Sequence, residues 1–295
     1  MSASPSPGRA SGSAAPWLGA VAGLQVVHLL AAATFLQDAH RLSLTGDVAG
    51  WAVGLLAVAG TLAATLSFAP GDYLRRVWGL LTLGAFLSLV STALRSYWMH
   101  AVPDVPFASS PLLPVRMVVV VLANVSTTFA LVLLARTYRQ SGLEPPPSSR
   151  ATVLWAVAAV SALAVGGPAL VTAMGHLGQG FAATCTAVIA LASTLADMTT
   201  ILLVAPILRV AYMLRGGRLA WVWWAMGVSG AVWLLYDARE WLAMVLPGNP
   251  TEVVELLRTL RTSGLAMLGL AGWLQRSALA TSQRESRARL AAPTG

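Results

Sequence analysis

The stretch Tyr236–Trp241, with the sequence YDAREW, decides how the rest of the chain is interpreted. It places three charged residues within four positions, near the end of an apolar run that begins at Leu219. A helix that faces lipid does not accept such charges easily, because the bilayer core offers them no water. We therefore expect these side chains to face other helices or to lie where a membrane meets water.

The composition of the whole chain indicates a membrane protein. Of its 295 residues 57% are hydrophobic and only 10% are charged, whereas soluble domains carry about 25% charged residues. Every one of the 19 basic residues is an arginine, so no lysine can form a retinal Schiff base. The one cysteine, Cys185, allows neither an intrachain disulfide nor a cysteine-based metal site.

Apolar stretches long enough to cross a bilayer recur along the chain, since a span needs about 20 apolar residues. Breaks rich in proline and glycine separate these stretches. We predict an all-α, polytopic transmembrane helical bundle with about eight spans, at residues 17–37, 48–69, 77–99, 112–136, 152–174, 182–208, 219–246 and 253–275. A disordered N-terminal tail (1–16), a transmembrane helical domain (17–276) and a disordered cytoplasmic tail (277–295) then make up the chain. The first stretch is also compatible with a signal peptide that is removed.

The arginines predict the orientation of this bundle. With eight spans, 13 of the 19 arginines fall on the side of the two termini. Positive residues favour the cytoplasm, so we expect a multi-pass protein of the bacterial inner membrane with both termini cytoplasmic. The net charge of +8 then reflects topology, with membrane lipids as surroundings and no nucleic acid as partner.

The two halves of the chain show a weak sign of internal duplication. Arg95, Tyr97 and Pro103 are followed, 144 residues later, by Arg239, Trp241 and Pro247. Two parallel four-helix repeats would produce this offset. A shared preference for arginine, aromatic residues and proline at membrane interfaces would also produce it.

The side opposite the termini carries charges at the ends of several expected spans. Arginine side chains there suit carboxylates, phosphates or lipid head groups. We predict that they form an outward-facing polar pocket, in which Glu255 pairs with Arg258 and in which Asp237 and Glu240 meet Arg258 or Arg261. The alternative is that the same residues only snorkel and tie the helices together. The candidate ligand-binding residues are Arg95, Arg116, Asp237, Arg239, Glu240, Glu255, Arg258 and Arg261.

Asp197 lies near the middle of an expected span, among serine and threonine residues. A carboxylate at that depth is costly unless it is paired or protonated. It is therefore a candidate proton or ion relay, the alternative being a neutral carboxyl within a hydroxyl network.

Three histidines, His40, His100 and His176, follow expected spans on the outer side. Together they could ligate a metal ion. The sequence has no nucleotide-binding motif, and we expect no bound cofactor.

The segment from Arg76 to Arg139 combines arginine, aromatic residues and proline in two helical hairpin ends, for example Arg95-Ser-Tyr97 before Pro103. It resembles the multi-helix membrane sensor regions of bacterial histidine kinases and diguanylate cyclases. The resemblance implies a sensing role. About 20 residues follow the last expected span, so we expect any output to pass through a cytoplasmic or membrane signalling partner.

Three functions remain open on the sequence alone. We favour a non-enzymatic sensor, ligand-binding or scaffold protein, because the short loops hold no catalytic motif. A small secondary transporter that uses Asp197 is the first alternative. A metal-dependent membrane enzyme acting on lipid, with the three histidines as ligands, is the second.

Overall fold

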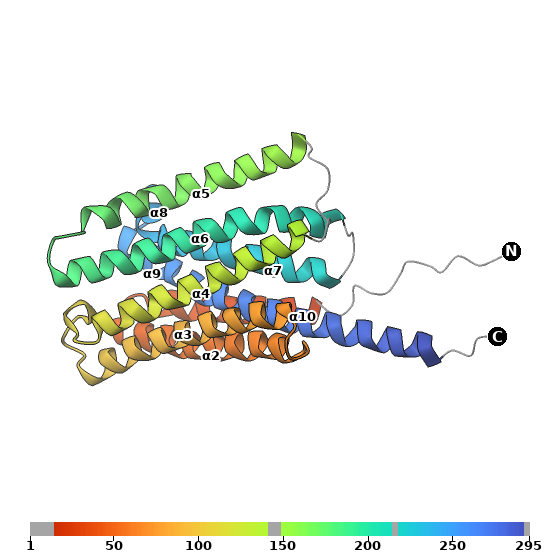
Figure 1. The fold of residues 1–295 in the computed structure, drawn as a ribbon. Coiled ribbons are helices and arrows are strands. Elements are labelled where there is room, and N and C mark those ends of the chain that lie inside the picture. The colour runs from red at the N-terminus through yellow and green to blue at the C-terminus, as the bar shows by residue number, and fades with distance from the viewer. Residues whose placement is uncertain (1–14, 141–148, 214–217, 292–295) are drawn as a thin grey trace.

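The computed structural model describes residues 15–140, 149–213 and 218–291, and helices are the only regular secondary structure in these ranges (Figure 1). The predicted all-α fold is confirmed for this part of the chain. The helices are α1 (Ala15–Thr34), α2 (Ala39–Leu66), α3 (Tyr73–Ala101), the short 3-10 helix η2 (Phe107–Ser109), α4 (Leu113–Gln140), α5 (Ser149–Gly175), α6 (Phe181–Met213), α7 (Arg218–Asp237), α8 (Arg239–Val245), α9 (Pro250–Arg258) and α10 (Leu260–Ala291).

Six of the described helices, α2 to α7, are long and apolar enough to cross a membrane. Large apolar side chains remain exposed along them, as at Val160 and Phe181. Such exposure is typical of helices whose outer surface is covered by lipid rather than water. The apolar part of α1, Leu18–Thr34, is shorter.

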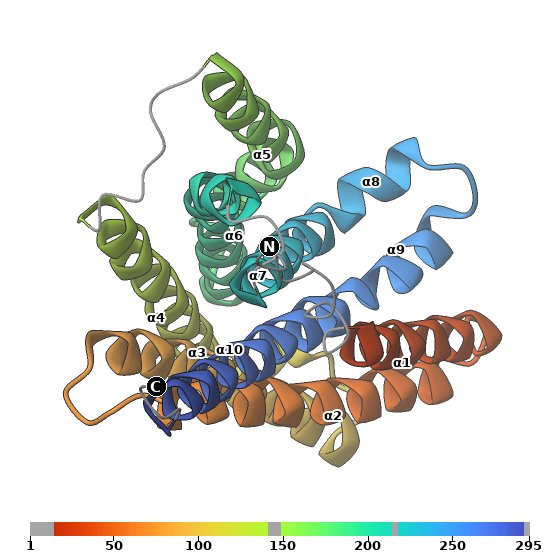
Figure 2. The same ribbon diagram turned by 90° about the vertical axis from the view of Figure 1, so that its right-hand side faces the viewer.

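The helices that enclose the interior form a closed ring. In the order α2, α3, α4, α6, α7 and α10, each helix packs against the next, and α10 returns to α2. Figure 2, which looks along the bundle, shows this arrangement. Outside the ring, α5 packs mainly on α6, and α1 lies against α2 and α10. The ring thus leaves space for a site between helices that are distant in sequence.

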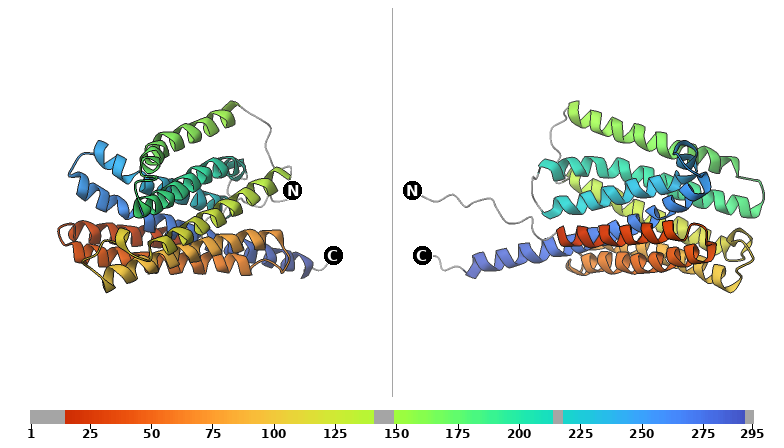
Figure 3. Two further views of the ribbon diagram at one scale, coloured as in Figure 1. Left: turned by 60° about the vertical axis from the view of Figure 1, so that its left-hand side comes forward. Right: turned by 180° about the vertical axis from the view of Figure 1, so that it is seen from behind.

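Side chains of α10 belong to the main core cluster of the bundle. Leu265, Ala271 and Leu274 are buried against α2 and α7. Because protein covers this helix, it tolerates a more polar sequence than α2 to α7. Figures 1 and 3 show that α10 also projects beyond its neighbours, at the end of the bundle where α1 begins.

Glycines bring α2 and α10 into close contact. A Cβ atom at Gly60 would collide with the backbone carbonyl of Gly269, and one at Gly272 would collide with the backbone of Gly60. Small residues allow two helix backbones to approach in this way. The α2–α10 contact closes the ring.

Helix starts follow from local capping. The carboxylate of Asp38 accepts a hydrogen bond from the Arg41 amide at 3.0 Å and begins α2. Asp72 does the same for α3 through the amide of Leu74. At α9, Asn249 caps the helix and Pro250 occupies its first turn.

The observed ends differ from the prediction in the last third of the chain. The expected helix at 219–246 is interrupted between Asp237 and Arg239, and the one at 253–275 is interrupted at Thr259. At the first break the Arg239 guanidinium donates to the carbonyl of Tyr236 at 3.0 Å. At the second the Thr259 hydroxyl donates to the Leu256 carbonyl at 2.7 Å, and such local bonds compete with the helix ladder.

The predictions for the N-terminal and the C-terminal tail have different outcomes. The N-terminal tail expected over residues 1–16 lies almost wholly outside the described residues. At the other end, α10 continues to Ala291, so most of the segment expected as a disordered tail (277–295) is helical.

Candidate functional site

A cavity of about 770 Å³ lies between the helices. Its volume is in the range of small-molecule sites. The walls come from α3, α4, α5, α6, α7, α8 and α10. Its polar lining residues include Ser88, Ser91, Thr92, Arg116, Asn124, Thr127, His176, Ser193, Thr194, Asp197, Thr200, Ser229, Tyr236, Asp237, Arg239, Glu240 and Arg261.

Three of the predicted arginines line this cavity: Arg116 from α4, Arg239 from α8 and Arg261 from α10. The Nε of Arg116 donates to the Ser91 hydroxyl at 3.2 Å, and its guanidinium lies 5.3 Å from the centre of the Phe107 ring. Among the described residues, neither Arg116 nor Arg261 has a carboxylate within ion-pair distance. Two of the three cationic groups therefore face the cavity without an acidic partner.

The third cation, Arg239, is only partly satisfied. Its ion pair with Glu240 spans 3.4 Å, and the Glu240 side chain is 72% exposed. Its guanidinium also stacks 4.5 Å from the centre of the Tyr236 ring. The buried Nε atom of Arg239 has no hydrogen-bond partner within the part of the chain that the structure describes.

The arginines are close enough to repel one another. Arg116 interacts electrostatically with Arg95 and Arg261, and Arg95 interacts with both Arg258 and Arg261. A cluster of like charges in a poorly solvated site is unfavourable unless something of opposite sign compensates it. The site is thus suited to an anion.

Two carboxyl groups also line the cavity. The carboxyl groups of Asp197 of α6 and Asp237 of α7 lie next to one another. The hydroxyl of Thr194 donates to Asp237 at 3.0 Å. Two neighbouring carboxylates repel each other when both are charged, which disfavours a second negative charge on the pair.

These contacts correct one sequence-based pairing. The prediction that Asp237 and Glu240 meet Arg258 or Arg261 was wrong, because Asp237 points to α6 and Glu240 pairs with its neighbour Arg239. The break between α7 and α8 separates the two acids, which a continuous helix over 219–246 would hold one turn apart.

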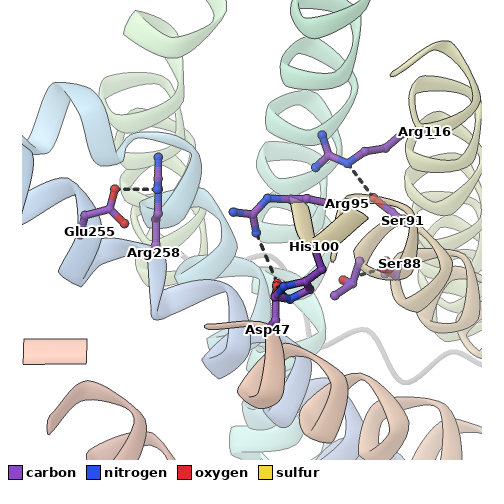
Figure 4. A network of polar contacts seen from close by, with 9 residues as sticks. Asp47, Ser88, Ser91, Arg95, His100, Arg116, Glu255 and Arg258 are labelled. Carbon is purple, nitrogen blue, oxygen red and sulfur yellow. Dashed lines mark hydrogen bonds and ion pairs between the residues drawn. The ribbon is translucent and has the colours of Figure 1, made fainter. Parts of the chain in front are cut away.

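Arg95 belongs to a second polar cluster beside the cavity (Figure 4). Its guanidinium lies 3.9 Å from a carboxylate oxygen of Asp47 on α2, and His100 lies 3.2 Å from the other oxygen. The side chain of Asp47 is only 6% exposed. This contact ties the C-terminal end of α3 to α2, and it gives Arg95 a structural partner that Arg116 and Arg261 lack.

The predicted pair within α9 is present. Arg258 contacts Glu255 at 2.6 Å (Figure 4). Neither residue lines the cavity. The pair therefore stabilises α9 locally, whereas Arg116, Arg239, Arg261 and the two aspartates form the site itself.

The three histidines do not gather into a metal site. His100 contacts Asp47, and His176 contacts Gln179 at 3.2 Å. Among the described residues no three histidine, cysteine, aspartate or glutamate side chains are placed to hold a metal ion. The membrane-enzyme alternative thereby loses the ligands on which it rested.

Two polar residues of α1 form hydrogen bonds with α10. His28 forms a hydrogen bond with the hydroxyl of Thr262 at 2.8 Å, and Gln25 accepts from Ser263 at 2.6 Å. Thr262 and Ser263 follow Arg261 directly on α10. The contacts of α1 thus fix the helix turn that carries a cavity arginine.

We expect Asp47→Ala to lower the free energy of unfolding by about 1–3 kcal/mol, because it leaves the partly buried Arg95 without its carboxylate. Thermal and denaturant unfolding in a neutral detergent measure the change. Glu240→Ala is the matched control, since its exposed ion pair is worth below about 1 kcal/mol. Equal effects of the two substitutions would contradict the structural role of Asp47.

Comparison with protein-family models, with curated proteins and with solved structures found no match. The fold and the site therefore define the class by themselves. The chain is an α-helical membrane protein, and its helices enclose a cavity lined by arginines and by a pair of carboxyl groups.

Proposed function

We propose that this protein binds a small molecule bearing an anionic group in the cavity, as a membrane sensor or ligand-binding protein. The observation that carries the proposal is that Arg116 and Arg261 face the cavity without carboxylate partners among the described residues. A guanidinium matches a carboxylate, phosphate or sulfate with two parallel hydrogen bonds. An anion placed between them would relieve their mutual repulsion.

The proposed topology has eight passes. The six long apolar helices account for α2 to α7; we add α1, and α10 shielded by its neighbours. The start of α1 and the end of α10 lie at one end of the bundle (Figure 3). The bias of arginines toward that end supports cytoplasmic termini in an inner membrane, with the cavity arginines toward the outer side. The ring order α2–α3–α4 followed by α6–α7–α10 supports two parallel halves.

The sensor interpretation is favoured by α10. This helix has 32 residues and carries Arg261 in its first turn. Its length is about 48 Å. It leaves the bundle at the opposite end (Figure 1). A ligand that moves Arg261 would therefore displace a helix end available to a signalling partner.

Saturable thermal stabilisation tests the binding proposal. Purified protein in a neutral detergent is titrated with a panel of small phosphates, sulfates and carboxylates at constant ionic strength. A ligand at 100 times its Kd stabilises the folded state by about 2.7 kcal/mol. We expect at least one anion to raise the melting temperature in a saturable way, while chloride does not. Absence of saturation for the whole panel would reject the proposal.

A second candidate function is a proton-coupled secondary transporter. The contact between Asp197 and Asp237 favours it, because a carboxyl pair in a membrane cavity can accept and release a proton. This observation does not depend on α10, which supports the sensor interpretation.

For this candidate we expect an anion gradient to drive proton uptake into proteoliposomes that contain the wild-type protein. Asp197→Asn should abolish this uptake, because the amide cannot exchange a proton with Asp237. A pH-sensitive dye inside the vesicles measures the uptake. Asp104→Asn, an exposed acid between α3 and η2, should leave it unchanged. Uptake that survives Asp197→Asn would exclude the carboxyl pair as the proton site, and absence of uptake by the wild type would exclude the transporter and leave the sensor.

A further inference from the structure

The cavity changes character along its length. On α4 it is lined in sequence by Arg116, Val120, Asn124, Thr127 and Leu131. These positions recur every three or four residues, so they form one stripe along the helix, and the stripe extends about 22 Å. The wall is cationic where α4 begins and apolar four turns further in.

Two other helices repeat this order. On α10 the lining passes from Arg261 to Leu265 and Leu268, and on α7 it passes from Asp237 to Met226. Both helices run beside the cavity within the same ring. The charged groups therefore share one end of the cavity, and Leu131, Met226 and Leu268 share the other.

Hydroxyl groups between the two ends do not make the middle strongly polar. Thr92 donates to the carbonyl of Ser88 at 3.1 Å, Thr200 to that of Ala196 at 2.8 Å, and Ser229 to that of Gly264 at 2.8 Å. These protons are used within the protein. At these three positions the hydroxyl protons are therefore not available to a ligand, and an apolar group can pass them.

The charged end has a surplus of positive charge. Arg116 and Arg261 lack acidic partners among the described residues, Arg239 has only the exposed Glu240, and repulsion between the neighbouring Asp197 and Asp237 disfavours a second negative charge on that pair. An anionic group is thus favoured at this end over a cationic one.

The cavity reaches the surface near α5 and α8. Thr172 and His176, at the outer end of α5, and Met244 on α8 line it and are exposed, Met244 by 72%. Val171 and Val245 beside them are exposed apolar residues. In Figure 2 α5 lies above α7, beyond α6, and α8 extends from α7 to the upper right. The opening is therefore bordered by surface suited to lipid.

From these features we infer that the ligand is an anionic amphiphile. Its head group lies among Arg116, Arg239 and Arg261, its apolar tail extends toward Leu131, Met226 and Leu268, and it reaches the cavity between α5 and α8. The inference rests on the proposed anion binding and specifies the class of ligand for the same site.

A chain-length series tests it. The probes are inorganic phosphate, ethyl phosphate, octyl phosphate and dioleoyl phosphatidate, added to the purified protein in a neutral maltoside detergent, with Kd measured by thermal shift and native mass spectrometry. Burial of each methylene is expected to improve Kd about fourfold. Octyl phosphate should therefore bind at least a hundredfold tighter than ethyl phosphate. The double variant Arg116→Gln/Arg261→Gln should lose this binding, and the exposed Arg41→Gln should retain it.

The outcomes separate the two proposals. If inorganic and octyl phosphate bind equally and both require the two arginines, the anion site stands and the amphiphile is rejected. If octyl phosphate binds the double variant as tightly as it binds the wild type, the signal reports partition into the micelle, and the amphiphile proposal is also rejected. If none of these probes binds, the amphiphile is rejected, and the panel of small phosphates, sulfates and carboxylates decides separately whether the anion site stands. Among supporting results, phosphatidate binding as tightly as octyl phosphate assigns the ligand to the bilayer, and weaker binding assigns it to a free single-chain acid.

Discussion

Replacing Arg116 and Arg261 together by glutamine is expected to weaken binding of the cavity's anion at least about a hundredfold. Hydrogen bonds to charged groups contribute about 1.5–3 kcal/mol each, and loss of two such contacts exceeds the 2.7 kcal/mol that corresponds to a hundredfold change in Kd. The folded state should not be weakened in parallel, because the substitutions also remove the repulsion between two clustered cations. Isothermal titration calorimetry with the tightest anion from the panel measures the effect.

Arg41→Gln is the matched control for this double variant. Its side chain is 66% exposed and pairs with Asp38 at 3.2 Å, away from the cavity. Binding by Arg41→Gln should equal that of the wild type. If the Arg116/Arg261 variant melts normally and still binds the anion with wild-type affinity, the two arginines are not the site.

The largest effect on stability is expected at Gly60. A methyl group there collides with the backbone of Gly269, where α2 and α10 touch. Backbone atoms cannot rotate away as a flexible side chain can, so the two helices must separate and the ring must open. We expect Gly60→Ala to destabilise the protein by about 3 kcal/mol, the upper part of the range for overpacked cores. Thermal unfolding of the purified protein in a neutral detergent measures this loss of stability.

The same substitution at Gly23 provides the control. Gly23 lies within α1, and an added Cβ there has no neighbour within 4 Å. Gly23→Ala should be neutral or stabilising by about 0.4–1 kcal/mol, because alanine restricts the unfolded chain. Similar melting temperatures for the two alanine variants would contradict the close contact between α2 and α10.

Hydropathy was sufficient to predict the helices that face lipid. The expected spans at 77–99, 152–174 and 182–208 fall within α3, α5 and α6, since lipid exposure demands continuous apolar sequence. The breaks after Asp237 and at Thr259 were missed because they depend on local hydrogen bonds of Arg239 and Thr259. Neither bond leaves a pattern that hydropathy detects.

The site was predictable as a set of charges but not as a set of contacts. Arg116, Arg239 and Arg261 were singled out because charged side chains are costly in a span, and the structure places all three on one cavity. The contact between Asp197 and Asp237 could not be predicted, since it joins side chains 40 positions apart through the packing of α6 on α7. Likewise, only the ring order reveals that Asp47 reaches Arg95.

The most direct test of the central claim is to locate an anion in the cavity. Crystals grown with selenate allow its position to be found from the anomalous scattering of selenium. The account predicts a peak within hydrogen-bonding distance of both Arg116 and Arg261. Selenate bound only at exposed arginines such as Arg41, with no peak in the cavity, would contradict it.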